Sequence, residues 1–143
     1  QIWDSGITNL TEGWNPSLPI IEDIAPDKSM NEVTSALSAV GLGDVPAWLR
    51  PFKVLSNGEQ FRAGLARLIC DAPNKVIVDE FTSVIDRQIA KIGASAFAKA
   101  WRRVPNRQII LLSCHYDIND LLLNSKFGRQ TEVTGVILKS ITI

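Results

Sequence analysis

The sequence predicts an α/β fold in which short parallel strands are joined by helices. Residues 75–78 and 108–113 form continuous apolar runs, the pattern of strands that are buried on both faces of a sheet. Between them, residues 86–103 carry apolar side chains at helical spacing, in a stripe that includes Ile92 and Phe97. A strand, a helix and a strand in this order form a βαβ unit, which implies parallel pairing and a right-handed crossover.

The rest of the chain predicts smaller elements around this unit. Residues 1–28 are rich in Pro, Gly, Asn, Ser and Asp and are expected to be irregular, with at most one short strand. Residues 29–32 match a capping box in front of an amphipathic run, so we expect a helical subdomain over residues 29–54. A further helix is expected over residues 55–70, and the loose alternation of residues 131–143 predicts one more strand near the sheet edge.

Composition restricts the class of protein. The chain has 143 residues, and its 15 Lys and Arg balance its 15 Asp and Glu. This zero net charge gives no electrostatic indication of a nucleic-acid partner. No apolar run approaches the roughly 20 residues that a membrane-spanning helix needs, and no charged-then-apolar signal segment opens the sequence. We therefore expect a cytoplasmic protein in which Cys70 and Cys114 are buried free thiols.

Two adjacent carboxylates follow the first predicted strand. Asp79 and Glu80 stand at its carboxyl end, and His115 follows the second strand. Ligands of parallel sheets bind at the carboxyl ends of the strands, so we expect these three side chains to converge there. Carboxylates in that position can hold Mg²⁺ and orient a water molecule. Taken singly, each of these residues is also common in loops that have no catalytic role.

A glycine-bearing loop opens the helix that precedes this strand. Helix N-termini attract phosphate through unpaired backbone N–H groups and the helix dipole. Ser56 and Glu59 alone make an ordinary capping box, which many helices have at their start. The order of loop, helix, strand and carboxylates is the feature that favours nucleoside triphosphate chemistry.

Together these segments resemble the C-terminal half of an ABC-type ATPase over about residues 30–120. The matching segments are the signature loop at residues 55–59, the Walker B strand at 75–80, the D-loop at 82–86 and the switch-histidine segment at 113–117. Asn57 stands in place of the usual Gly, Glu59 in place of the common Gln, and Phe81 where most transporter ATPases carry Pro. In these departures the chain looks closest to non-transporter ABC ATPases that are sometimes fused to an acetyltransferase-like domain.

The resemblance implies a partial P-loop NTPase core with parallel strands and a small helical subdomain, in which residues 55–130 form the C-terminal part of the core. It implies ATP and Mg²⁺ as cofactors, and a head-to-tail dimer with a second copy or with a complete ABC ATPase. Asp79 would hold Mg²⁺ through water, Glu80 would polarise the attacking water, and His115 would bridge to the γ-phosphate. The residues implied to contact a nucleotide on the partner, or to communicate across the dimer, are Ser56, Asn57, Gly58, Glu59 and Asp86.

The P-loop motif Gly-x-x-x-x-Gly-Lys-Ser/Thr is absent from the sequence. That loop supplies the backbone cradle and the lysine for the β- and γ-phosphates, so we expect ATPase activity only where a P-loop is supplied. The chain is expected to be a fragment with an upstream or fused domain, and a naturally P-loop-less protein is the other explanation. The alternative function is a regulatory module that docks on a complete ATPase without hydrolysing ATP. A structural remnant is disfavoured, because it need not retain Ser56, Asp79 and Glu80 together.

Overall fold

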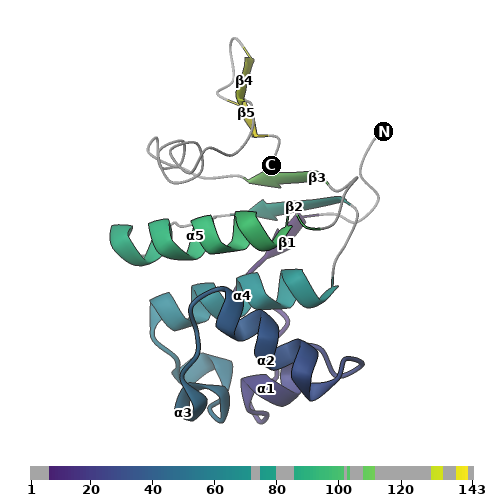
Figure 1. Cartoon of the computed structure of the whole chain (residues 1–143), viewed down its shortest axis with the longest axis vertical. Helices are drawn as coiled ribbons and strands as arrows, with labels where there is room; N and C mark the ends of the chain where they lie inside the picture. The colour runs from purple at the N-terminus through teal and green to yellow at the C-terminus, as the bar shows by residue number, and fades with distance from the viewer. Residues whose placement is uncertain are drawn as a thin grey trace.

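The computed structural model describes residues 7–71, 75–79, 86–101, 103, 108–111, 130–133 and 138–141. Its central sheet has three strands in the order β1-β2-β3. They are β1 (Ile7–Asn9), β2 (Lys75–Asp79) and β3 (Gln108–Leu111). Figure 1 shows α5 and α4 on one side of this sheet and the smaller helices α1 to α3 beyond α4. Among the helices of this part of the chain, none is both long and apolar enough to cross a membrane.

Strands β2 and β3 are parallel, with Lys75 opposite Gln108 and Val78 opposite Leu111. The predicted parallel pair is therefore confirmed. Val78 of β2 is fully buried and belongs to the core.

Strand β1 pairs in parallel with the other edge of β2, so that Ile7 lies opposite Ile77 and Asn9 opposite Asp79. The sequence allowed for one short strand before residue 28, but it did not place that strand in the sheet. A strand of three residues is too short to show a hydrophobic period, and its pairing depends on residues far along the chain.

The helices in order are α1 (Ile20–Asp23), α2 (Met30–Ala39), α3 (Val45–Trp48), the 3₁₀ turn η1 (Phe52–Val54), α4 (Asn57–Asp71) and α5 (Arg87–Trp101). The predicted capping box at the start of α2 is confirmed. The backbone N–H of Glu32 donates to Ser29 Oγ at 3.2 Å, and the backbone N–H of Ser29 donates to Glu32 Oε2 at 2.9 Å.

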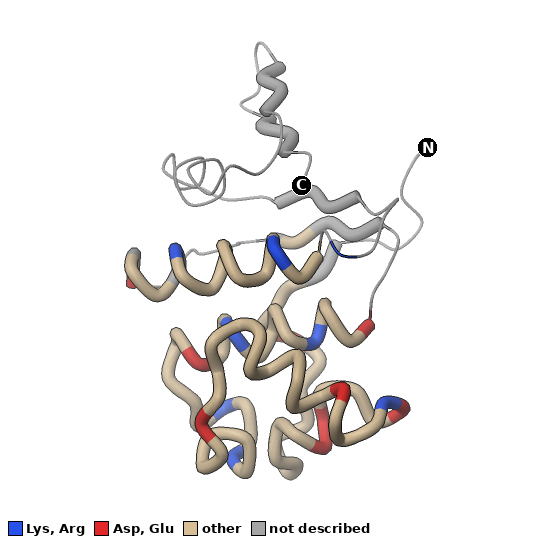
Figure 2. Tube along the Cα trace, viewed as in Figure 1, with Lys and Arg blue, Asp and Glu red and all other residues tan. Residues whose placement is uncertain are grey.

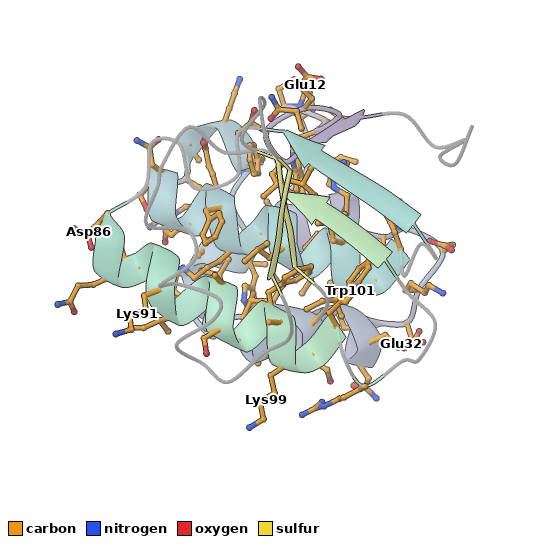
Figure 3. The ribbon with its side chains drawn as sticks, turned by 90° about the horizontal axis from the view of Figure 1, so that it is seen from above. Glu12, Glu32, Asp86, Lys91, Lys99 and Trp101 are labelled. Carbon is orange, nitrogen blue, oxygen red and sulfur yellow. The ribbon has the colours of Figure 1, made fainter. Side chains whose placement is uncertain are left out.

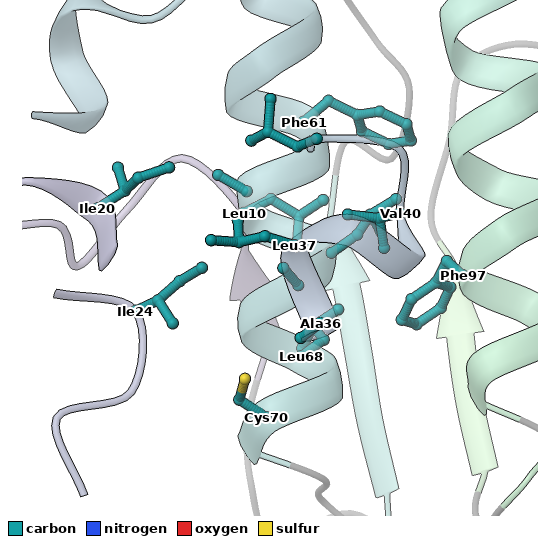
Figure 4. Packing of buried hydrophobic residues seen from close by; sticks show 14 of the residues in the cluster. Leu10, Ile20, Ile24, Ala36, Leu37, Val40, Phe61, Leu68, Cys70 and Phe97 are labelled. Atoms are coloured by element: carbon teal, nitrogen blue, oxygen red, sulfur yellow. The ribbon is translucent and has the colours of Figure 1, made fainter. Parts of the chain in front are cut away.

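One apolar core joins the helices to the sheet. Figure 4 shows Leu10, Leu37, Val40 and Phe61 gathered between the helices, with Phe97 reaching in from α5. The core therefore draws on described residues from Leu10 to Trp101.

The predicted burial of Ile92 was wrong, since 63% of its surface is exposed. Among the described residues of α5, the buried hydrophobic ones are Ala94, Phe97, Ala98 and Trp101. They follow the spacing i, i+3, i+4 and i+7 of a single helix face, and Ile92 lies off that face.

Beyond β3, where the sequence predicted one strand, the structure has two short ones. They are β4 (Gln130–Val133) and β5 (Leu138–Ile141), and they pair antiparallel in a sheet of their own. Antiparallel neighbours close in sequence pair with each other more readily than with a distant edge, because little chain has to be ordered.

Candidate nucleotide-binding site

Helix α4 begins with a reciprocal capping box between Ser56 and Glu59. The backbone N–H of Ser56 donates to Glu59 Oε1 at 2.9 Å, and the backbone N–H of Glu59 donates to Ser56 Oγ at 3.3 Å. The first of these bonds is the main reason that the pKa of Glu59 is lowered, against a smaller opposing effect of burial. Glu59 is therefore an ionised carboxylate that is already engaged by its own helix start.

Ser56 and Asn57 are both exposed at this helix start. Ser56 Oγ accepts the bond from Glu59, which leaves the hydroxyl proton able to donate to a ligand. The amide of Asn57 can also donate, and the first N–H groups of a helix have no partner within the helix. The loop at residues 55–59 thus presents several donors to an anion.

Gly58 is buried where α4 meets α5. A Cβ atom at this position would lie 3.0 Å from Ile89 Cδ1 and 3.1 Å from Ile89 Cγ2. Glycine therefore permits the close approach of the two helices at this point. The start of α4 rests against the first turn of α5.

Asp86 caps the start of α5. Its Oδ1 atom accepts hydrogen bonds from the backbone N–H groups of Gln88 at 3.0 Å and Ile89 at 3.3 Å. Asp86 is exposed, and Figure 3 shows it at the outer end of α5. Because Ile89 also contacts Gly58, the structure places Asp86 on the same side of the fold as the loop at residues 55–59.

Arg62 ties the first turns of α4 to the end of α2. Its Nε atom donates to the carbonyl oxygen of Gly58 at 3.0 Å, and Nη1 donates to that of Gly41 at 3.1 Å. Gly41 has a φ of +87°, the left-handed conformation that glycine adopts without strain. The helix start that carries Ser56 is thus held from two sides, by α5 and by α2.

Asp79 is the last residue of β2, and its Cα lies opposite that of Asn9 at the end of β1. The sequence pattern did not single out Asn9, because the strand that it ends, Ile7–Asn9, is too short to show an apolar pattern. Asn9 Oδ1 accepts hydrogen bonds from the backbone N–H of Thr11 at 2.9 Å and from Thr11 Oγ1 at 2.7 Å. Two polar residues therefore stand side by side at the carboxyl edge of the sheet, where ligands of parallel sheets bind.

Glu80 and His115 lie outside the described residues, so their convergence with Asp79 stays a prediction. Within the described ranges, no group of three or more His, Cys, Asp or Glu residues is arranged to hold a metal ion. A water-mediated Mg²⁺ site does not need such a group, because Mg²⁺ keeps several waters and uses one or two carboxylates with substrate phosphates. Asp79 stands at the end of β2, and its role toward Mg²⁺ stays a prediction.

Cys70 is a buried free thiol, as predicted, and Cys114 lies outside the described residues. Burial raises the pKa of Cys70 to about 11, so the thiol stays protonated at neutral pH. A protonated buried thiol is neither a good metal ligand nor a nucleophile.

Charge on the described surface is mixed. Figure 2 shows basic and acidic residues interspersed along the described helices.

No protein-family model matches the chain. Among curated proteins, it is 35% identical over 104 residues to PhnT of Salmonella typhimurium, whose name describes a 2-aminoethylphosphonate import ATP-binding protein. The PhnT of Salmonella choleraesuis matches equally well. Each match covers 72% of this chain and 27% of the relative, so the chain spans about a quarter of the length of these curated relatives.

Among solved structures, the bacterial ABC transporter cassette MJ0796 in its dimeric form matches with a TM-score of 0.66 and 14% identity. That match covers 79% of this chain and 54% of the cassette. A second dimeric structure of MJ0796, bound to ADP and Pi in a post-hydrolysis state, matches with a TM-score of 0.65 and 15% identity. The chain is thus similar in sequence to import ATP-binding proteins and shares the fold of part of an ABC ATPase cassette.

Proposed function

We propose that this chain supplies the signature loop and the carboxylate edge of an ABC-type ATPase that binds and hydrolyses ATP in a head-to-tail dimer. The observation that carries the proposal is the start of α4, where exposed donors at Ser56 and Asn57 stand on a helix that α5 and α2 hold in place. Similarity to import ATP-binding proteins and to a cassette solved with ADP and Pi supports it.

The loop at residues 55–59 would act on a nucleotide bound to the partner. Backbone N–H groups at the start of α4, the hydroxyl of Ser56 and the amide of Asn57 would donate to the γ-phosphate. Gly58 would contribute by keeping the helix start against Ile89, and Glu59 by orienting the backbone of Ser56. Phosphoryl transfer depends mainly on such positioning and on neutralised charge.

The carboxyl edge of the sheet would act on this chain's own nucleotide. Asp79 would hold Mg²⁺ through water, Glu80 would polarise the attacking water, and His115 would bridge to the γ-phosphate. Bound Mg²⁺ would neutralise charge on the β- and γ-phosphates. Asp86, at the start of α5, would link this edge to the partner subunit across the dimer interface.

The dimer partner would be a second copy of this chain's full protein or another complete ABC ATPase. The P-loop for this chain's own nucleotide would come from an upstream segment, because the motif is absent from this sequence. A complete partner would bring the P-loop and nucleotide that the loop at residues 55–59 caps. A cytoplasmic location, a place among the non-transporter ABC ATPases and fusion to an acetyltransferase-like domain are further parts of the same proposal.

The test compares the chain alone with a form that is supplied with a P-loop-bearing segment or partner. Calorimetry with Mg-ATP should show very weak binding to the chain alone, and ATPase activity should appear only in the supplied form. Glu80→Gln keeps the size of the side chain but removes the charge that polarises water, so hydrolysis should fall by about 10²-fold or more while ATP binding persists.

Ser56→Arg should block the nucleotide sandwich by filling the space that the γ-phosphate needs. Ser29→Arg is the matched control, because Ser29 also caps a helix but lies at the start of α2. Full activity of the Glu80→Gln protein would favour the regulatory module instead. Stimulation of a partner that survives both Glu80→Gln and Ser56→Arg would leave only a packing role for these residues.

A further inference from the structure

The chain directly after β1 runs close to the second half of α4. Leu10 is buried there, and a Cβ atom at Gly64 would lie 2.8 Å from Leu10 Cβ and 3.1 Å from the Leu10 carbonyl oxygen. The backbone directly after Asn9 therefore contacts the helix at a position where only glycine leaves room.

Arg67, one turn further along α4, binds the next residues of this segment. Its Nη1 atom donates to the carbonyl oxygen of Gly13 at 3.2 Å, and Nη2 donates to that of Glu12 at 3.4 Å. The guanidinium carbon also lies 3.5 Å from the centre of the Trp14 ring. One planar side chain thus holds two carbonyl groups and one aromatic face at the same time.

Trp14 is covered on both faces. Its other face stacks on Phe52, with 4.3 Å between ring centroids and 5° between ring planes. The indole Nε1 donates to the Leu10 carbonyl oxygen at 2.9 Å. The Trp14 stack, formed by Arg67, Trp14 and Phe52, is therefore a packed structural unit, and Trp14 has no free face for a nucleotide base.

In the sequence, Trp14 follows soon after Asn9, which ends β1 at the carboxyl edge of the sheet. Strand β1 has three residues, and its pairing with β2 ends at Asn9 opposite Asp79. The backbone N–H of Glu12 donates back to the Asn9 carbonyl oxygen at 3.2 Å, so the turn held by Arg67 is also bonded to the end of β1. Because so short a strand contributes little pairing of its own, the contacts of the adjoining turn help to decide where β1 lies.

We propose that Arg67 and Trp14 are positioning residues for the Mg²⁺-binding edge of this ATPase. By holding the turn after β1 against α4, they set the backbone of Asn9 and, through strand pairing, the backbone of Asp79. Because the same helix begins with the loop at residues 55–59, α4 then links that loop to the edge of its own sheet. The inference rests on the proposed function for the ligand at the edge, and on the contacts above for the way the edge is held.

Arg67→Lys tests the inference because lysine keeps the charge but loses the fork that reaches two carbonyl groups and covers the ring. Amide hydrogen exchange in the chain alone should become about tenfold faster at Thr11 and Glu12, whose N–H groups bond to Asn9. Arg62→Lys is the matched control, since Arg62 also bonds to two carbonyl groups but to none after β1. Unchanged exchange at Thr11 and Glu12 in Arg67→Lys would overturn the inference.

The second readout uses the supplied form, in which a P-loop is present. Arg67→Lys should raise the Mg²⁺ concentration for half-maximal activity about fivefold or more, with kcat at saturating Mg²⁺ largely kept. Faster exchange with an unchanged Mg²⁺ dependence would show that the Trp14 stack only packs, which would also overturn the inference. Trp14→Phe is the milder variant if Arg67→Lys does not fold, because it keeps the stacking and loses only the bond to Leu10.

The two proposals fail in different ways. If the supplied form has no ATPase activity, the proposed function is wrong and the Mg²⁺ part of the inference falls with it. If activity depends on Glu80 but the Mg²⁺ concentration for half-maximal activity is the same in Arg67→Lys, the proposed function stands and the positioning role is wrong.

Discussion

The two halves of α4 have different neighbours and different freedom. The first half presents exposed Ser56 and Asn57 and meets α5 where Gly58 faces the side chain of Ile89. The second half is enclosed, because Gly64 faces backbone of the segment after β1 and Arg67 holds the turn beyond it. A side chain such as Ile89 can turn aside, whereas backbone cannot. The helix is therefore anchored at its far half and offers its near end to a ligand.

Gly64→Ala should give the largest change in stability. The added methyl group would overlap Leu10 at 2.8 Å, and the nearby carbonyl oxygen at 3.1 Å cannot move without shifting the backbone. Overpacking of this kind costs about 1–3 kcal/mol, which exceeds the gain of up to about 1 kcal/mol from replacing glycine in a helix. Urea denaturation measures the difference. Unchanged or higher stability would show that the second half of α4 is not locked.

Ser56→Ala should lower the free energy of unfolding by about 1 kcal/mol, because the N–H of Glu59 loses its acceptor. Ser29→Ala in α2 is the matched control and should cost a similar amount. Only Ser56→Ala should also reduce ATPase activity in the supplied form. Equal activity of the two variants would assign the Ser56 hydroxyl to capping alone.

Gly58→Ala should change stability by less than about 1 kcal/mol. The overlap is with flexible atoms of Ile89 at 3.0–3.1 Å, and alanine gains helix propensity over glycine. Denaturation of Gly58→Ala and Gly64→Ala under the same conditions compares the two halves directly. A larger loss for Gly58→Ala than for Gly64→Ala would reverse the comparison.

The smallest expected effect concerns the pH dependence of the free energy of unfolding. Glu59 near the start of α4 and Asp71 at its end should change that free energy in opposite directions on acidification. The pKa of Glu59 is lowered, chiefly by the backbone hydrogen bond from Ser56, so its contribution is present above about pH 4.5 and is lost as the pH falls through its folded pKa. The pKa of Asp71 is raised, chiefly by burial, so its proton is bound more tightly in the folded state and acid favours folding there.

Denaturation between pH 3 and pH 6 separates these two contributions. Glu59→Gln should lose less stability on acidification than the unmodified chain, and Asp71→Asn should lose more. The effects should be small, because Glu59 is partly exposed and Asp71 is exposed to solvent, which weakens both contributions. If the free energy of unfolding changed equally with pH in both variants, the two ends of α4 would not differ in their response to acid.

Local patterns predicted much of this fold. The capping boxes at Ser29 and Ser56 depend on residues three positions apart, and the structure has both of them. The parallel pairing of β2 and β3 follows from the order of strand, helix and strand, since that order restricts the connection. Ile92 was misplaced because its apolar character was taken as a sign of burial, although its position lies on the side of α5 opposite the buried residues Phe97 and Trp101.

The functional role of the site residues stays a prediction. Ser56 and Glu59 stood out as a capping box, whereas Asn57, Gly58 and Asp86 were implied only by the resemblance to ABC-type ATPases. Asn9 did not stand out, since its importance comes from lying opposite Asp79 across a strand pair. Nor did the sequence indicate that Gly58 and Gly64 are needed for contacts with Ile89 and Leu10, which are distant along the chain.

The sequence by itself therefore determined where α2 and α4 begin and that β2 and β3 pair in parallel. These features arise from neighbouring residues and from the period of the apolar pattern. Only the tertiary structure decided that β1 joins the sheet, that Arg67 and Trp14 hold the turn beyond it, and that α4 has one anchored and one presented half. Each of these depends on contacts between residues more than fifty positions apart, such as Arg67 with Glu12 and Gly13, and such pairs become neighbours only when the chain has folded.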